Sequence, residues 1–244
     1  MEHYQDNTVQ QPWEHAAAEG AVKVTTVAMQ NAFINKVYLW MCTALALSAV
    51  AAWMVISRPA LMQMVAKGFI VLAIAEVALV IWLTAAIRKI SASTAAIGFV
   101  AYSVLNGLTL SPIFAIYTQS SIVTTFLAAS LTFGVCGAAG YAIKGEMSGF
   151  GRLLLVALIG LLVGSLVNFF IGSQGFETIL TYGGVLIFAG LAAYDTNQLK
   201  HMSRSIGSVP AAEAQKLALI GALSLYLDFI NLFLYLLRIF GRRD

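Results

Sequence analysis

The sequence contains very little charge. Only 10% of its 244 residues are Asp, Glu, Lys or Arg, whereas 60% are hydrophobic, and the mean hydropathy is +0.85. A soluble domain of this length needs more polar surface than such a composition provides. The shortage of charge therefore excludes an ordinary soluble protein and predicts an all-α, polytopic membrane protein.

Cysteine and histidine are scarce as well. Cys42 and Cys136 fall in apolar runs and neither has a CxxC partner, so we expect buried free thiols without a disulfide framework. His3 and His15 lie near the N-terminus and His201 lies in a loop, a spacing that does not suit a metal cluster. The basic residues form no patch, which argues against nucleic acid as a partner. We therefore expect no dedicated cofactor.

Residues 1–32 form a polar segment ahead of the first apolar run. It carries four acidic residues, and Lys23 is its only Lys or Arg. A signal peptide needs a basic region followed by an apolar one, and this segment has neither. We expect a disordered cytosolic tail over residues 1–32 and a membrane domain over residues 33–244.

Seven apolar runs follow, each close to the ~20 residues that a membrane-spanning helix requires. They cover residues 37–56, 68–87, 95–117, 122–143, 153–172, 178–199 and 217–238. Nine Lys and Arg residues fall on the side of the N-terminus and five on the other side, which favours a cytoplasmic N-terminus and an external C-terminus. Because the C-terminal segment Arg238 to Arg243 is itself basic, a re-entrant seventh run remains an alternative.

Three acidic residues, Glu76, Asp195 and Asp228, lie inside these runs. A carboxylate in the bilayer core costs roughly 2.5 to 3.5 kcal/mol, so such residues face a cavity, a partner or each other. Glu76 either lines a cation path or is kept protonated by a neighbour. If Asp195 and Asp228 are close, they share a proton and titrate as a coupled pair, which would make a pH sensor. Their oxygens could also bind Ca²⁺ transiently.

Polar side chains recur at helical spacing in four of the runs. They are Tyr102, Asn106 and Thr109 on the third run, Ser165 and Asn168 on the fifth, Asp195 and Gln198 with Tyr194 and Asn197 beside them on the sixth, and Ser224, Asp228 and Asn231 on the seventh. Intramembrane polar groups usually face inward, so we expect a polar interior or ion path. Arg88 ends the second run on the same side as Asp195, and it either pairs with Asp195 or extends to lipid headgroups.

Three motifs carry a resemblance to a known family. They are Asn106 to Ser111 (NGLTLS), Ala193 to Gln198 (AYDTNQ) and Ser224 to Phe233 (SLYLDFINLF). Over roughly residues 30 to 243 the chain resembles the bacterial branch of the Bax inhibitor family, the transmembrane Bax-inhibitor-motif proteins. The resemblance implies six helices around a central seventh, a pH-sensitive calcium leak channel, and Asp195 and Asp228 as its sensor. It also implies an arginine latch, for which Arg88 is the nearest candidate, and a second-helix acid at Glu76.

Two other functions are compatible with the sequence. One is an interaction protein whose N-terminal segment binds a membrane protease or another membrane partner. The other is an intramembrane aspartyl protease, but its Gly-x-Gly-Asp signature would need glycines where this chain has Leu225 and Leu227. We therefore expect a monomeric, non-enzymatic protein of a bacterial inner membrane that passes Ca²⁺ and responds to protons.

Overall fold

The computed structural model describes residues 12–87 and 89–243, with side chains described from Val27 onward. Seven long α-helices make up this part of the chain: α1 (Pro12–Ile56), α2 (Pro59–Ala86), α3 (Ala92–Phe114), α4 (Gln119–Ala142), α5 (Ser148–Ile171), α6 (Gln174–Ser205) and α7 (Ala211–Phe240). A single 3₁₀ turn, η1 (Ile206–Ser208), links α6 to α7. All seven helices are long and apolar enough to cross a membrane, which confirms the all-α polytopic fold.

The helix ends follow local sequence signals. Ser91, Thr118 and Ser173 precede α3, α4 and α6, and each side-chain oxygen accepts a hydrogen bond from a backbone N–H of the first turn. Gly172 ends α5 with a φ of 68°, a left-handed conformation that glycine adopts without strain. The three capping residues lie outside the apolar runs, so α3, α4 and α6 each begin a few residues before the run that hydrophobicity alone predicts.

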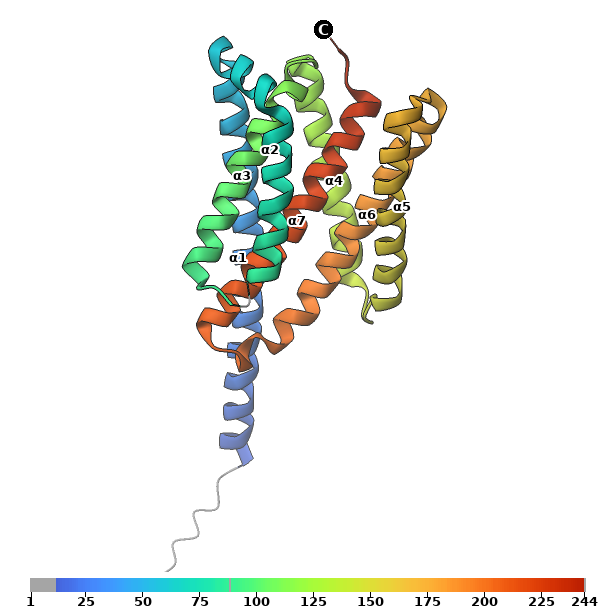
Figure 1. The fold of residues 1–244 in the computed structure, drawn as a ribbon. Coiled ribbons are helices and arrows are strands. Elements are labelled where there is room, and N and C mark those ends of the chain that lie inside the picture. Colours follow the sequence, from blue (N-terminus) through green and yellow to red (C-terminus); the bar gives the residue numbers. More distant parts are fainter. Residues whose placement is uncertain (1–11, 88, 244) are drawn as a thin grey trace, which may run out of the picture.

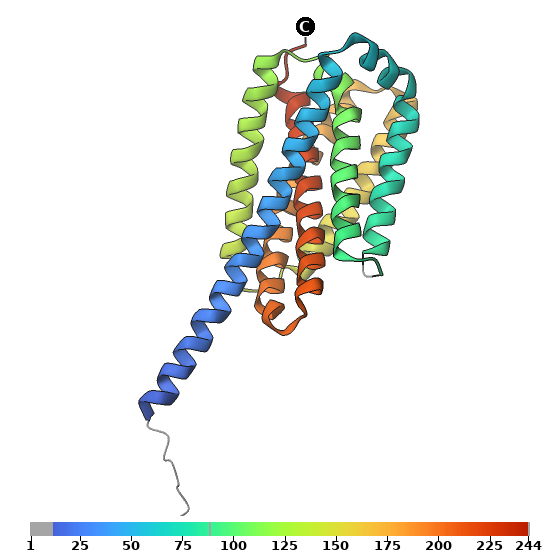
Figure 2. The ribbon, with the colours of Figure 1, turned by 90° about the vertical axis from the view of Figure 1, so that its left-hand side faces the viewer.

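Helix α7 lies in the middle of the bundle (Figures 1 and 2). It packs against α1, α3, α4 and α6, while α2 and α5 lie at the edges against α3 and α6 respectively. Within its most apolar stretch 67% of the residues are buried, compared with 50% in α3 and fewer in the other spans. The expectation of a central seventh helix is therefore confirmed.

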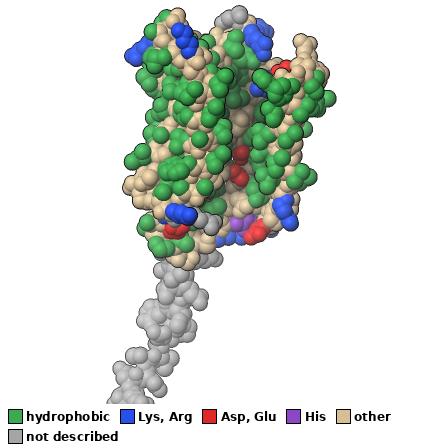
Figure 3. Space-filling view, in the orientation of Figure 1, with side chains coloured by type: hydrophobic (Ala, Val, Ile, Leu, Met, Phe, Trp, Pro, Cys, Tyr) green, Lys and Arg blue, Asp and Glu red, His purple; other side chains and the backbone are tan. Residues whose placement is uncertain are grey.

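The surface of the bundle suits a bilayer. Apolar side chains cover its length, and Lys and Arg side chains gather at its two ends (Figure 3). In a membrane, lipid would cover these outward apolar side chains. The side chains that are buried within the protein itself are those that lie between helices.

Helix α1 extends well beyond the other helices at its N-terminal end (Figures 1 and 2). Only Val27–Ile56 of this helix counts as a membrane span. Residues 12–32, which the sequence assigned to a tail, are helical and continuous with the span, and residues 1–11 lie outside the described part of the chain. The helix therefore runs through the predicted domain boundary at residue 32 without a break.

Two glycines allow helices of the bundle to approach closely. A Cβ atom at Gly107 of α3 would lie 2.8 Å from Cβ of Ala51 on α1, and one at Gly140 of α4 would collide with the backbone of Ala193 on α6. Small residues permit this kind of backbone contact in membrane bundles. The two contacts allow α1 to pack closely against α3, and α4 against α6. This close packing positions the polar side chains described below.

Candidate functional site

The two intramembrane aspartates come together between α6 and α7. The carboxyl of Asp195 is within side-chain hydrogen-bonding reach of Asp228 and of Ser224. Ser224 and Asp228 are four residues apart, so they share the face of α7 that meets α6. Asp228 is only 6% exposed. The predicted face of the seventh helix therefore faces a neighbouring carboxylate.

The Asp195 and Asp228 carboxyls are arranged so that they can share one proton. Among the described residues, Oδ2 of Asp228 is buried without a hydrogen-bond partner. A buried acceptor without a donor is costly, and a protonated carboxyl is one of the few groups that could supply the donor here. Two carboxyls within hydrogen-bonding reach of each other can share one proton. The geometry thus suits a pair with one proton and one negative charge.

A cavity of about 180 Å³ leads to this pair. It is lined by Asp195, Gln198, Met202, Ile220, Gly221 and Ser224. A water molecule occupies about 30 Å³ in the liquid, so the cavity has room for several. In the space-filling view, acidic side chains are visible about halfway along the bundle amid apolar surface (Figure 3). The cavity extends from Asp195 along α6 to Met202, toward the end of the bundle where α6 joins α7.

Glu76 forms the centre of a second polar cluster. Its carboxylate accepts hydrogen bonds from Tyr102 (3.3 Å), Thr109 (2.7 Å) and the amide of Asn106. All three donors come from α3 and form the predicted stripe on that helix. The second-helix acid is therefore held by three neutral donors in this structure.

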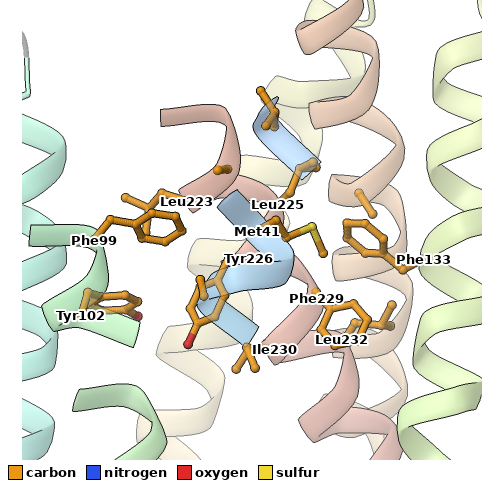
Figure 4. Packing of buried hydrophobic residues seen from close by; sticks show 14 of the residues in the cluster. Met41, Phe99, Tyr102, Phe133, Leu223, Leu225, Tyr226, Phe229, Ile230 and Leu232 are labelled. Carbon is orange, nitrogen blue, oxygen red and sulfur yellow. The ribbon is translucent and has the colours of Figure 1, made fainter. Parts of the chain in front are cut away.

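Tyr226 of α7 connects the Glu76 cluster to α1. Its hydroxyl donates to Oδ1 of Asn106 at 2.8 Å and lies 2.7 Å from the Ser48 hydroxyl. Its ring meets those of Phe99 and Tyr102 edge to face, with centroids 5.9 and 6.0 Å apart (Figure 4). The second cluster thus joins α1, α2, α3 and α7.

Helix α7 separates the two clusters. Tyr226 and Asp228 are two residues apart, which corresponds to about 200° of rotation around a helix. They point to opposite sides, while Leu225 and Leu232 of the same helix are fully buried. The sequence predicted one polar interior, and the structure places Glu76 and Asp228 in two separate clusters.

The remaining predicted residues on α6 and α7 contact their own surroundings. Gln198 is exposed and donates to the Tyr194 hydroxyl at 2.5 Å. The ring of Tyr194 lies against Gly151 of α5. Asn231 donates to the carbonyl of Leu227 within α7 at 2.8 Å. Of these, only Gln198 lines the cavity beside Asp195.

Asn168 also lies away from both clusters. Asn168 lies at the end of α5, where its side-chain oxygen accepts from the backbone N–H of Ser173 at 3.1 Å. That end of α5 is opposite to the end where α6 joins α7 (Figure 1). Arg88 lies outside the described residues, so its pairing with Asp195 stays a prediction.

Asn197, which the sequence placed only beside the polar face of the sixth run, has a structural role that the sequence did not predict. It is 1% exposed, and its amide donates to the carbonyls of Gly140, Ile143 and Gly145 at 3.1 to 3.3 Å. Its carbonyl oxygen accepts from the N–H of Met147 at 3.3 Å. Asn197 therefore fastens the loop between α4 and α5 to the helix that carries Asp195. Its place within the motif next to Asp195 was the available signal.

Replacing Tyr226 with Phe should destabilise the protein by about 2 kcal/mol, because Asn106 and Ser48 both lose a buried hydrogen bond. Thermal unfolding of the purified protein in detergent measures this. Tyr235→Phe is the matched control, because Tyr235 lies on the same helix and stacks its ring on Phe188; it should cost less than about 0.5 kcal/mol. Equal losses in the two variants would contradict the assignment.

The described residues contain no group of three or more His, Cys, Asp or Glu side chains that could hold a metal ion. The Asp195 and Asp228 pair offers two carboxylates, with Ser224 beside them. Ca²⁺ takes six to eight oxygen ligands, so water would supply most of the shell at this position. The donor set suits passage of a hydrated cation better than a permanent site.

Comparison with known proteins gives consistent matches. The sequence profile of the family described as Inhibitor of apoptosis-promoting Bax1 (Bax1-I) matches residues 30–244. The Inner membrane protein YbhL of Escherichia coli K12 is 46% identical over 214 residues, which cover 86% of this chain and 92% of that protein. An uncharacterized protein of Deinococcus radiodurans is 38% identical over 219 residues, covering 90% and 94%. An uncharacterized membrane protein of Streptococcus pyogenes serotype M1 is 42% identical over 173 residues, covering 70% and 73%.

Proposed function

Because this chain belongs to the Bax1-I (Bax inhibitor) family of membrane proteins, we propose that it is a pH-sensitive calcium leak channel of the inner membrane. The inner membrane follows from the relative YbhL, which is named for it. In this proposal Ca²⁺ passes down its gradient, and the Asp195 and Asp228 pair gates the path. The N-terminus and the cavity beside Asp195 lie on the cytoplasmic side, as the distribution of Lys and Arg favours.

The observation that carries the proposal is the contact between carboxyls on two different spanning helices. With one proton, the pair forms a charge-assisted hydrogen bond that holds α6 to α7. When the last proton leaves, the two negative charges repel; for unit charges ~4 Å apart, this repulsion is roughly 4 kcal/mol at an effective dielectric constant of about 20. A second proton replaces the charge-assisted bond with a weaker neutral one. The contact between α6 and α7 is therefore strongest when the pair carries a single proton.

The cavity supplies the path toward this gate. Its lining includes the oxygens of Asp195, Gln198 and Ser224, the type of ligand that Ca²⁺ prefers. Separation of Asp228 from Asp195 extends this polar lining along α7. Ions then meet carboxylate and hydroxyl oxygens in place of hydrocarbon.

Reconstituted liposomes that contain a Ca²⁺ indicator test this function. The protein should conduct Ca²⁺ at a rate that changes with pH, with a minimum where the pair holds one proton and a rise of about tenfold on at least one side, as expected for a gate with a few kcal/mol of charge coupling. Protein-free liposomes provide the baseline. Equal leak with and without protein at every pH would refute the channel.

A role as an interaction protein is the second candidate, and the projecting part of α1 favours it. This helix extends past the bundle on the side of the proposed cytoplasmic end (Figure 2). Such an extension offers a surface for a membrane protease or another membrane partner. If deletion of residues 1–26 leaves Ca²⁺ flux unchanged and releases a co-purifying membrane protein, the extension serves binding and the bundle serves transport.

A further inference from the structure

A second cavity, of about 540 Å³, lies at the opposite end of the bundle from the α6–α7 link. It lies where α4 begins and α7 ends, near the C-terminus (Figure 1). Its lining includes Ser120, Ser121, Thr124, Thr125, Phe240 and Arg242. Four hydroxyl-bearing residues and one arginine therefore line a space that the proposed gate does not use.

The C-terminal segment is fixed beside this cavity. The carbonyl of Arg242 accepts from the N–H of Thr118 at 2.9 Å, and the N–H of Arg242 donates to the Ser121 hydroxyl at 3.0 Å. The guanidinium of Arg243 lies over the ring of Tyr117, 5.7 Å from its centroid. These contacts hold the backbone of Arg242 against the first turn of α4, so the position of its side chain at the cavity is built into the fold.

Thr125 has an unused hydroxyl at this cavity. Other hydroxyls on α4 donate to the carbonyl one turn earlier: Thr124 to Ser120 at 2.9 Å, and Thr132 to Ala128 at 2.9 Å. Thr125 is 1% exposed, and its hydroxyl oxygen has no hydrogen-bond partner among the described residues. A buried hydroxyl without a partner costs about 1 to 3 kcal/mol. A ligand in the cavity would remove this cost.

The positively charged Arg242 in the lining favours an anionic ligand in this cavity. The guanidinium of Arg242 binds phosphate with good geometry. The first turn of α4, a helix of 24 residues, directs its free N–H groups and the positive end of its dipole toward the same region. The lining residues include no carboxylate among the described residues. The Thr125 hydroxyl, which has no partner among the described residues, adds a donor for a phosphate oxygen.

The position of the cavity, at the level where membrane spans begin and end, indicates the source of the anion. It lies beside Gln119 and Phe240, the first residue of one span and the last of another. Phe240 is 59% exposed and places an aromatic ring at this level, where aromatic side chains meet lipid headgroups. We propose that this cavity binds the phosphate of an anionic phospholipid headgroup, held by Arg242 and by the Thr125 hydroxyl.

Lipid binding to the full-length, delipidated protein in detergent tests the proposal. Phosphatidylglycerol is titrated and the bound fraction is measured by native mass spectrometry. Arg242→Gln should weaken binding about tenfold, and Thr125→Val about threefold, because each removes a donor to phosphate. Arg58→Gln and Thr132→Val are matched controls, because Arg58 lies in the loop between α1 and α2 at the same end and Thr132 already has its partner. Both controls should stay within twofold of the unmodified protein.

Two further measurements, thermal unfolding without lipid and competition by other ligands, test the site and the identity of its ligand. Without lipid, Thr125→Val should unfold at the same or a higher temperature than the unmodified protein, since it removes an unpaired hydroxyl, and a lower temperature would indicate a purely structural role. Diacylglycerol, which lacks phosphate, should not compete with phosphatidylglycerol. Competition by millimolar inorganic phosphate as strong as that by the lipid would overturn the lipid assignment, and equal binding by Arg242→Gln and Arg58→Gln would overturn the site.

Discussion

Replacing Asp228 with Asn is expected to abolish the pH dependence of Ca²⁺ flux in liposomes. Asn has almost the same shape as Asp and donates a hydrogen bond to Asp195 at every pH. The contact between α6 and α7 then no longer depends on a shared proton, and the repulsion of roughly 4 kcal/mol between two carboxylates cannot arise. Flux should vary less than about twofold across the range in which the unmodified channel changes about tenfold.

The same result is expected for Asp195→Asn, because the two residues titrate as one unit. Glu177→Gln is a suitable control, because Glu177 is an exposed acid in the first turn of the same helix α6. It removes one carboxylate without changing the pair. If either aspartate variant keeps the full pH profile, the gate lies elsewhere and the aspartates only connect the helices.

Replacing Asn197 with Ala should cause the largest loss of stability among the polar substitutions considered. The carbonyls of Gly140, Ile143 and Gly145 and the N–H of Met147 lose a buried partner together. Removing a group that satisfies several buried polar atoms costs about 3 kcal/mol or more. We expect the unfolding temperature in detergent to fall by roughly 5 to 10 °C.

Asn231→Ala provides the comparison, since it is the same chemical change in a neighbouring helix. Asn231 makes a single hydrogen bond to the carbonyl of Leu227 in its own helix. Its loss should cost less than about 1 kcal/mol. If the two variants unfold at the same temperature, the loop between α4 and α5 does not depend on Asn197.

The seven spans could be predicted because the length of an apolar run is a direct requirement of the bilayer. The residues at which each helix begins and ends were harder to predict. The run predicted at 178–199 is the helix Gln174–Ser205, because a spanning helix continues into the polar region until a cap or a turn stops it. The central place of α7 came from the family resemblance, since periodicity within one helix does not tell which neighbours surround it.

The candidate site was predictable in part. Polarity within an apolar run selected Glu76, Asp195 and Asp228, which contact side chains of neighbouring helices in the structure. It could not assign Glu76 and Asp195 to separate clusters, because that depends on the order of the helices around α7. The role of Asn197 was missed because we expected one polar face on the sixth helix, with Asn197 only beside it. In the structure the turn from Tyr194 to Gln198 meets α5, α7 and α4 in succession, so consecutive residues all have partners. Tyr226 was missed because its ring resembles the surrounding apolar residues.

The position of α7 between the two clusters has a thermodynamic consequence. Tyr226 and Asp228 are rigidly connected by two residues of one helix, so a rotation of α7 that separates Asp228 from Asp195 also displaces Tyr226 from Asn106 and Ser48. The energies of the two contacts are then linked, and a substitution at one cluster changes the effect of a substitution at the other. In a double-mutant cycle, Tyr226 and Asp228 would show cooperativity although their side chains face opposite sides of the helix. The central helix would thus transmit strain from α1, α2 and α3 to the proton-binding pair.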